Sequence, residues 1–209
     1  MGHVVLLGDS IFDNACYVPG RPAVIDQVRQ ALPHGWLATL LAVDGHSTED
    51  VVRQLGGLPA SATHLVVSAG GNDALGESGI LGEDTGTVGE ALALVHEVRT
   101  RFRRSYRAML QALSAVGKPM AVCTVYDAVP GLAAAEQTAL AGFNEIILRE
   151  AFLAGLPVID LRLVCDRPAD YSDVSPIEPS AVGGAKIARV IAEVVTTHDF
   201  SRRRSTVYR

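Results

Sequence analysis

Five short apolar segments recur along the chain, and each is followed by a stretch in which apolar residues have helical spacing. The apolar segments are residues 3–7, 36–43, 64–68, 120–125 and 157–161. The helical stretches are residues 22–32, a segment that starts at 47–50, and residues 88–116, 132–154 and 180–195. Strands that are apolar throughout are typical of a parallel sheet covered by helices on both faces. Right-handed crossovers then predict an α/β fold, a three-layer α/β/α sandwich around a five-stranded parallel sheet.

The composition fits one domain and excludes several classes of protein. No linker or internal repeat divides the 209 residues, so we expect a single domain over residues 1–200 and a basic, solvated tail at 201–209. The 18 basic against 23 acidic residues and 5% aromatic content argue against nucleic-acid binding. No run approaches the length of a membrane span, and the apolar start is too short for a signal peptide, so we expect a cytoplasmic protein without a membrane partner. The sequence leaves the oligomeric state open.

Polar residues follow the first predicted strand, where an open parallel sheet binds its ligands. Gly8-Asp9-Ser10 stands directly after this strand. A small residue lets the chain turn sharply, so that the Ser10 hydroxyl is presented at the sheet edge as a nucleophile. A plain turn is the alternative interpretation of this tripeptide.

Two more strand ends supply hydrogen-bond donors. Gly71-Asn72-Asp73 follows the third strand, and Gly45 follows the second. The Asn72 amide and the Gly45 N–H are candidates for an oxyanion hole, because they donate hydrogen bonds without bringing a competing proton. The three cysteines and six histidines show no metal-ligand spacing, and no phosphate-loop glycine motif occurs, so we expect no metal and no cofactor.

Ser10, Gly45 and Asn72, in this order and at these positions, resemble the SGNH (GDSL-type) hydrolase family. The resemblance covers nearly the whole chain. It implies a flavodoxin-like sandwich and hydrolysis of esters through a seryl-enzyme intermediate. Ser10 would be the nucleophile, and its N–H would form the oxyanion hole together with the Gly45 N–H and the Asn72 side chain.

The last block departs from the family pattern, which expects Asp-x-x-His-Pro before the final helix. Here the chain has Ser175-Pro176-Ile177-Glu178-Pro179, so Glu178 stands at the histidine position and Ser175 at the aspartate position. Glu178 is therefore our candidate general base, provided that burial raises its pKa. His46 is the alternative base. Asp9, Asp170 and Asp173 are further candidates, although for Asp9 the position favours a hydrogen-bonding role within the turn.

The substrate is predicted to be a small-molecule ester, either an O-acyl group on a sugar or metabolite or a short-chain carboxylic ester. Gly71, Tyr126 and Asp127 are predicted to line its pocket, and Asp73 is a further candidate site residue. Two other functions remain open. One is a binding protein with impaired catalysis, which the missing histidine favours, and the other is an acyltransferase that uses the same acyl-enzyme.

Overall fold

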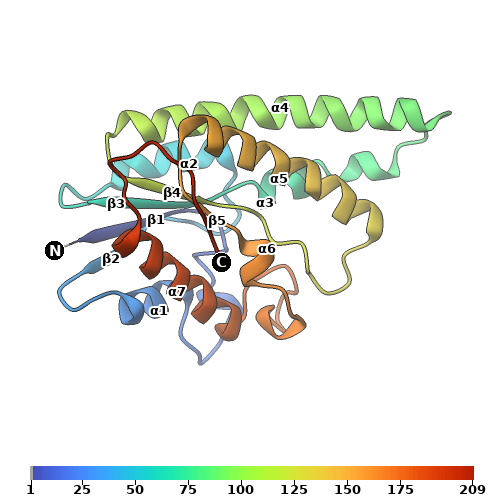
Figure 1. Ribbon diagram of the computed structural model, residues 1–209. Helices are drawn as coiled ribbons and strands as arrows, with labels where there is room; N and C mark the ends of the chain where they lie inside the picture. Colours follow the sequence, from blue (N-terminus) through green and yellow to red (C-terminus); the bar gives the residue numbers. More distant parts are fainter. Residues whose placement is uncertain (1) are drawn as a thin grey trace.

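The computed structural model describes residues 2–209, so that Met1 of the predicted domain lies outside it. It contains a parallel sheet between two layers of helices, which confirms the predicted fold class (Figure 1). The strand order is β2-β1-β3-β4-β5-β6. The strands are β1 His3–Gly8, β2 Leu37–Leu40, β3 His64–Ser68, β4 Met120–Cys123, β5 Val158–Ile159 and β6 Val207–Tyr208.

The sixth strand corrects the predicted number of five. β6 lies within residues 201–209, which the sequence analysis expected to be a solvated tail, and it pairs in parallel with β5. The Val158 N–H donates to the Thr206 carbonyl and the Asp160 N–H to the Tyr208 carbonyl, both at 2.9 Å. Two residues are too few for a periodic pattern, so this pairing with a distant strand leaves no local signal in the sequence.

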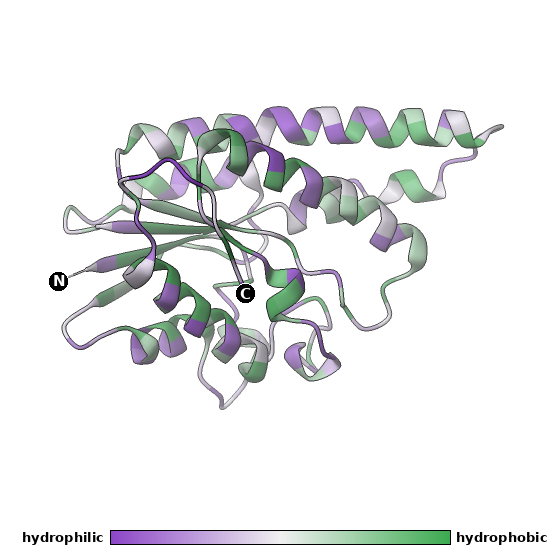
Figure 2. Cartoon of the chain, viewed as in Figure 1, coloured by the Kyte–Doolittle hydropathy of each residue, from purple (hydrophilic) through white to green (hydrophobic). Residues whose placement is uncertain are grey.

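Helices cover both faces of the sheet. α1 and α7 pack together on one face, whereas α2, α4 and α5 cover the other. β1 shows why both faces are apolar: Val4 and Leu6 join the core under α1 and α7, while Val5 and Leu7 join the core under α4 and α5. The helices are α1 Val24–Ala31, α2 Thr48–Gln54, α3 Gly71–Gly76, α4 Val88–Ala115, α5 Ala134–Ala154, α6 Leu161–Val164 and α7 Ala181–Thr197. Figure 2 shows largely hydrophobic strands between helices that carry both hydrophobic and hydrophilic residues.

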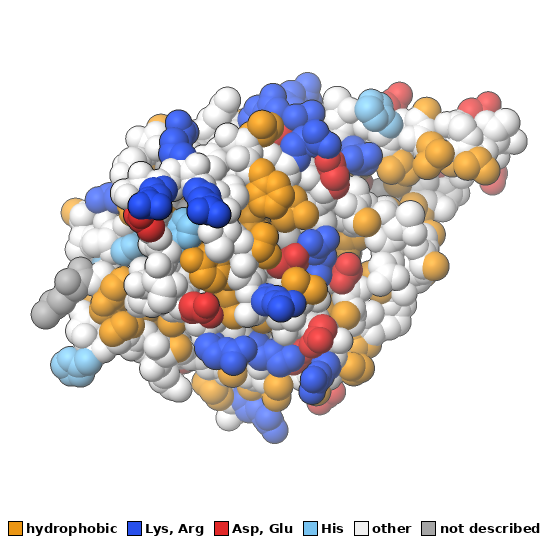
Figure 3. Space-filling model, viewed as in Figure 1, with side chains coloured by type: hydrophobic (Ala, Val, Ile, Leu, Met, Phe, Trp, Pro, Cys, Tyr) orange, Lys and Arg blue, Asp and Glu red, His pale blue; other side chains and the backbone are white. Residues whose placement is uncertain are grey.

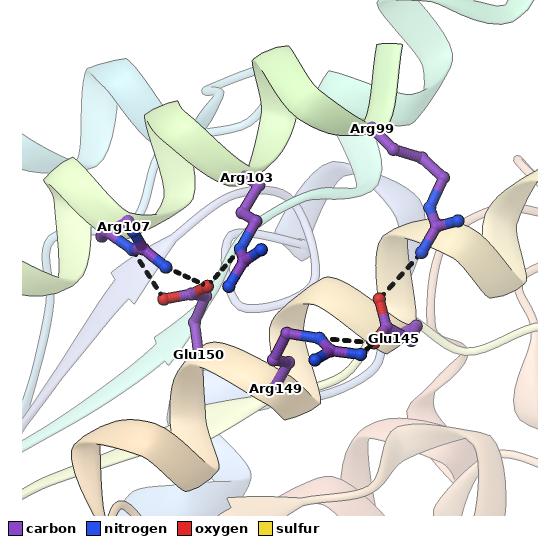
Figure 4. Close-up of polar contacts among 6 residues, drawn as sticks. All are labelled: Arg99, Arg103, Arg107, Glu145, Arg149 and Glu150. Carbon is purple, nitrogen blue, oxygen red and sulfur yellow. Dashed lines mark hydrogen bonds and ion pairs between the residues drawn. The ribbon is translucent and has the colours of Figure 1, made fainter. Parts of the chain in front are cut away.

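Ion pairs join α4 to α5 along their exposed side (Figure 4). The Glu150 carboxylate is buried and accepts hydrogen bonds from Arg103 at 2.6 Å and from Arg107 at 2.8 and 2.9 Å. These bonds, led by the one from Arg107, hold the pKa of Glu150 below its usual value although burial opposes them. One turn or more away, Glu145 accepts from Arg99 and Arg149. These ion pairs fix the two helices to each other.

None of the helices within residues 2–209 combines the length and the apolar character that crossing a membrane requires.

Candidate active site

The turn after β1 is fixed by backbone geometry. Gly8 has a φ of +132°, and a Cβ at this position would lie 1.8 Å from the Ser68 carbonyl oxygen of β3. Only glycine fits there. The chain then turns, with the Phe12 and Asp13 N–H groups donating to the Asp9 carbonyl at 3.1 and 3.2 Å. Ser10 is consequently placed at the carboxyl end of the sheet, with 7% of its surface exposed.

Gln54, at the end of α2, holds this turn through two hydrogen bonds to the backbone of Gly8. Gln54 Oε1 accepts from the Gly8 N–H at 2.8 Å, and its Nε2 donates to the Gly8 carbonyl at 2.7 Å. Nε2 also lies 2.9 Å from Nδ1 of His46. Gln54 is not predictable as a site residue, because a glutamine within a helical stretch carries no signal of a partner 46 residues away.

Glu178 reaches the site from a closed loop ahead of α7. An antiparallel bridge joins Tyr171 to Pro179, and the Ser172 N–H donates to the Glu178 carbonyl at 2.8 Å. The Tyr126 hydroxyl donates to the Ile177 carbonyl at 2.6 Å. These contacts hold Glu178 in a buried position, with 4% of its surface exposed.

The environment of Glu178 makes its carboxyl group a stronger base than usual. Burial raises its pKa to about 7, hydrogen bonding from the Ser10 side chain partly offsets this rise, and the negative charge of Asp44 adds to it. Its Oε2 atom is buried and has no hydrogen-bond partner among residues 2–209. Ser10 lies close enough to this carboxyl group to lower its pKa, and the buried Oε2 atom can accept a hydrogen bond from a further donor.

Asp9 lines the same cavity as Ser10 and Glu178, and the pKa of its carboxyl group is raised as well. Burial raises the pKa of Asp9 to about 8, against the hydrogen bond that its Oδ1 accepts from the Ile11 N–H at 3.2 Å. The negative charges of Glu178 and Asp73 raise this pKa further. At neutral pH, Asp9 is thus mostly protonated and supports the turn as a neutral group.

The segments that follow β2 and β3 are joined to each other by hydrogen bonds. The Asn72 amide donates to the His46 carbonyl at 3.0 Å. Asp73 accepts from the N–H and the hydroxyl of Thr48, at 3.1 and 2.6 Å. The loop that carries Gly45 is anchored next to the nucleophile, since the Val43 N–H donates to the Gly8 carbonyl at 3.1 Å.

Gly45 adopts a φ of +79°, which favours glycine, and it is exposed. Asp73 of α3 connects to α2 through its hydrogen bonds from Thr48. Burial raises the pKa of Asp73, although these bonds oppose the rise.

One cavity of about 140 Å³ brings several predicted residues together. Among its lining residues are Asp9, Ser10, Gly71, Asn72, Tyr126 and Glu178. Asp127, His46, Gly45 and Ser175 are not among them. Ser175 contacts Glu178 through the backbone, its carbonyl accepting from the Glu178 N–H at 3.0 Å. No group of three or more potential metal ligands is found within residues 2–209.

The apolar walls of the cavity were not anticipated as part of the site. Val95 and Val98 come from α4, and Leu140 and Phe143 come from α5. Their spacing follows the helical period of core residues, so the sequence alone does not distinguish a cavity wall from the core.

A family model described as the GDSL-like Lipase/Acylhydrolase family matches residues 6–186 of the chain. The chain belongs to this family. The description of the family names lipases and acylhydrolases, which supports a hydrolase function for this member. A comparison with curated proteins finds no match.

Solved structures agree with the fold of this family member. The lipase Lip_vut3 from a goat rumen metagenome has a TM-score of 0.74 at 16% identity, over 96% of this chain and 100% of that one. An extracellular lipase from Streptomyces rimosus has a TM-score of 0.66 at 19% identity, over 94% and 100%. An acetyl xylan esterase from Geobacillus stearothermophilus has a TM-score of 0.66 at 13% identity, over 93% and 94%.

Proposed function

We propose that this protein is a serine esterase that hydrolyses carboxylic esters of small molecules through an acyl-enzyme on Ser10, with Glu178 as the general base. The observation that carries the proposal is that Ser10 and the buried carboxyl group of Glu178 line the same cavity at the carboxyl end of the sheet. Burial raises the pKa of this carboxyl group to about 7. An unperturbed glutamate, with a pKa of about 4.3, is a poor proton acceptor for serine. At about 7, Glu178 matches the basicity of the histidine that it replaces in the sequence pattern.

In the first half of the reaction, Ser10 Oγ attacks the ester carbonyl carbon, and its proton passes to Glu178. The negative charge that develops on the carbonyl oxygen is stabilised by the Ser10 and Gly45 N–H groups and by the Asn72 amide. The bond to the alcohol oxygen then breaks, and protonated Glu178 returns its proton to the departing alcohol. The acyl group stays on Ser10.

In the second half, water attacks the acyl carbon and gives a proton to Glu178. The bond to Ser10 Oγ breaks, and Oγ takes back the proton. The products are a carboxylic acid and free enzyme. The same carboxyl group acts as base and acid in both halves, which requires a pKa close to the working pH.

The test compares Ser10→Ala and Glu178→Gln with wild type in turnover of 4-nitrophenyl acetate, and in labelling by a fluorophosphonate followed by mass spectrometry. We expect Ser10→Ala to abolish labelling and turnover. We expect Glu178→Gln to lower kcat by about 10²–10⁴-fold, the range for loss of a general base. Glu97→Gln, an exposed residue of α4, serves as the matched control.

Glu178→His provides a second test, because it restores the residue type of the family pattern. It should retain far more turnover than Glu178→Gln. If turnover survives in Ser10→Ala, the proposed mechanism is wrong. Ligand binding without any turnover would instead favour a binding protein, and transfer of the acyl group to an added alcohol would favour an acyltransferase.

A further inference from the structure

The cavity beside Ser10 continues well beyond the reacting atoms. It runs from the nucleophile past Asn72 into a space between α3 and the following 3₁₀ helix, Ser78–Gly82, on one side and the first half of α4 and of α5 on the other. Its polar reacting groups lie at one end. Most of the remaining wall is made by aliphatic and aromatic side chains, among them Leu75, Ile80, Val95, Val98, Leu140 and Phe143.

Two carboxylates of this wall are engaged elsewhere. Glu77 is paired with Arg101 of α4 at 2.8 and 3.3 Å. Glu136 accepts from the Ala133 N–H at 2.8 Å, where it closes the first turn of α5. The interior therefore offers almost no hydrogen-bond partner beyond the reacting end, so an occupant is held by burial of apolar surface.

The size of the cavity limits the occupant. A volume of about 140 Å³ has room for roughly ten water-sized groups, on the scale of one water per 10–15 Å³ of probe-occupied space. An unbranched chain of about six to ten carbon atoms fits this space. Figure 3 shows hydrophobic side chains at the surface near the projecting start of α4. Leu75 and Leu81 are both exposed and part of the cavity lining.

The two halves of an ester have different requirements at this site. The alcohol must take a proton from Glu178 and leave while the acyl group is still bound to Ser10. The Gly45 loop on the other side of Ser10 is exposed and polar: Asp44 accepts a hydrogen bond from the Tyr17 hydroxyl at 2.8 Å. A polar alcohol can leave over this loop, whereas the apolar cavity suits the acyl group that stays on Ser10.

We propose that the cavity is an acyl-chain pocket, and that the substrates are esters of unbranched acids of about six to ten carbons with polar alcohols. This inference rests on the proposed function. Each methylene moved from water into the cavity raises kcat/KM by about three- to fourfold, until the cavity is full.

The experiment measures kcat/KM for 4-methylumbelliferyl esters from acetate to laurate, and in parallel for acetate esters of alcohols from ethanol to octanol. Wild type is expected to prefer octanoate over acetate by at least 100-fold, with a fall at laurate. Ala139 lines the cavity, so Ala139→Trp should lower the octanoate-to-acetate ratio at least tenfold. Ala135→Trp, one turn earlier on α5 and outside the lining, should leave the ratio unchanged. Ala139→Leu, a smaller change, replaces the Trp variant if circular dichroism shows that the latter does not fold.

The inference is overturned if acetate is the best acyl group, if Ala139→Trp and Ala135→Trp behave alike, or if rates follow the length of the alcohol instead. In the first of these cases the proposed esterase function still stands. If no ester is hydrolysed, the esterase function fails, and the pocket is judged by calorimetric titration of methyl octanoate against methyl acetate. Tighter binding of the octanoate that Ala139→Trp weakens supports the pocket, and equal binding refutes it.

Discussion

Replacing Asp9 with asparagine is expected to make the protein less sensitive to rising pH. The folded-state pKa of Asp9 is about 8, compared with 3.8 for the unperturbed group. Because the folded state binds this proton more tightly than the unfolded chain, its stabilising contribution is complete below about pH 4 and is lost as the pH rises to about 8. A rise of about four pKa units corresponds to about 6 kcal/mol, at about 1.4 kcal/mol for each unit.

Asp9→Asn keeps an oxygen atom that accepts the Ile11 N–H and cannot ionise. Whatever its effect at low pH, the difference in unfolding free energy between variant and wild type should shift in favour of the variant by about 1.4 kcal/mol per pH unit from pH 5 to pH 7. Urea unfolding followed by circular dichroism at four values between pH 5 and pH 8 measures this slope.

The exposed loop residue Asp84 supplies the matched control, and Asp84→Asn should run parallel to wild type. A difference between Asp9→Asn and wild type that stays constant with pH would show that Asp9 is ionised throughout, and would refute the argument from burial.

Three further predictions concern the site and its supports. Asp44→Asn removes a negative charge that raises the pKa of Glu178, so the rising limb of the kcat/KM profile should move to lower pH, which stopped-flow or plate assays from pH 5 to pH 9 will show. Asn72→Ala should lower kcat by about 10²–10³-fold, the range for loss of one oxyanion donor. Gly8→Ala should cost about 3 kcal/mol or more in urea unfolding, because the added methyl group meets a carbonyl oxygen of β3 at 1.8 Å, whereas Gly56→Ala meets nothing within 4 Å.

The sequence predicts the sheet and much of the site for one topological reason. Parallel strands present their carboxyl ends at the same edge, so Ser10, Asn72 and the loop of Gly45 were expected to meet there. The structure brings Ser10 and Asn72 to one cavity and anchors the Gly45 loop beside the turn. The sequence indicates Glu178 through its position before the final helix, but only the structure shows that this residue is buried.

Other features depend on contacts between residues far apart in the chain. Gln54 supports the nucleophile turn through two bonds to Gly8, and nothing near Gln54 in the sequence indicates this. β6 is only two residues long and exists because β5 offers a free edge. His46 was a candidate base by its position in the sequence, but its Nδ1 is engaged with Gln54, and the residue does not line the cavity.

α4 is long enough for its two halves to have different roles, one in the core and one in the cavity wall. Its second half, with Tyr106 and Met109, packs on the sheet, while Val95 in its first half reaches past the strands to the cavity wall. Val98 belongs both to the cavity wall and to the core, so substitutions at Val95 and in the turns before it are the ones that can reshape the cavity while leaving the buried side chains of the second half of α4 in place. Sequence changes in these first turns, whether natural or engineered, can therefore alter substrate preference with little effect on folding.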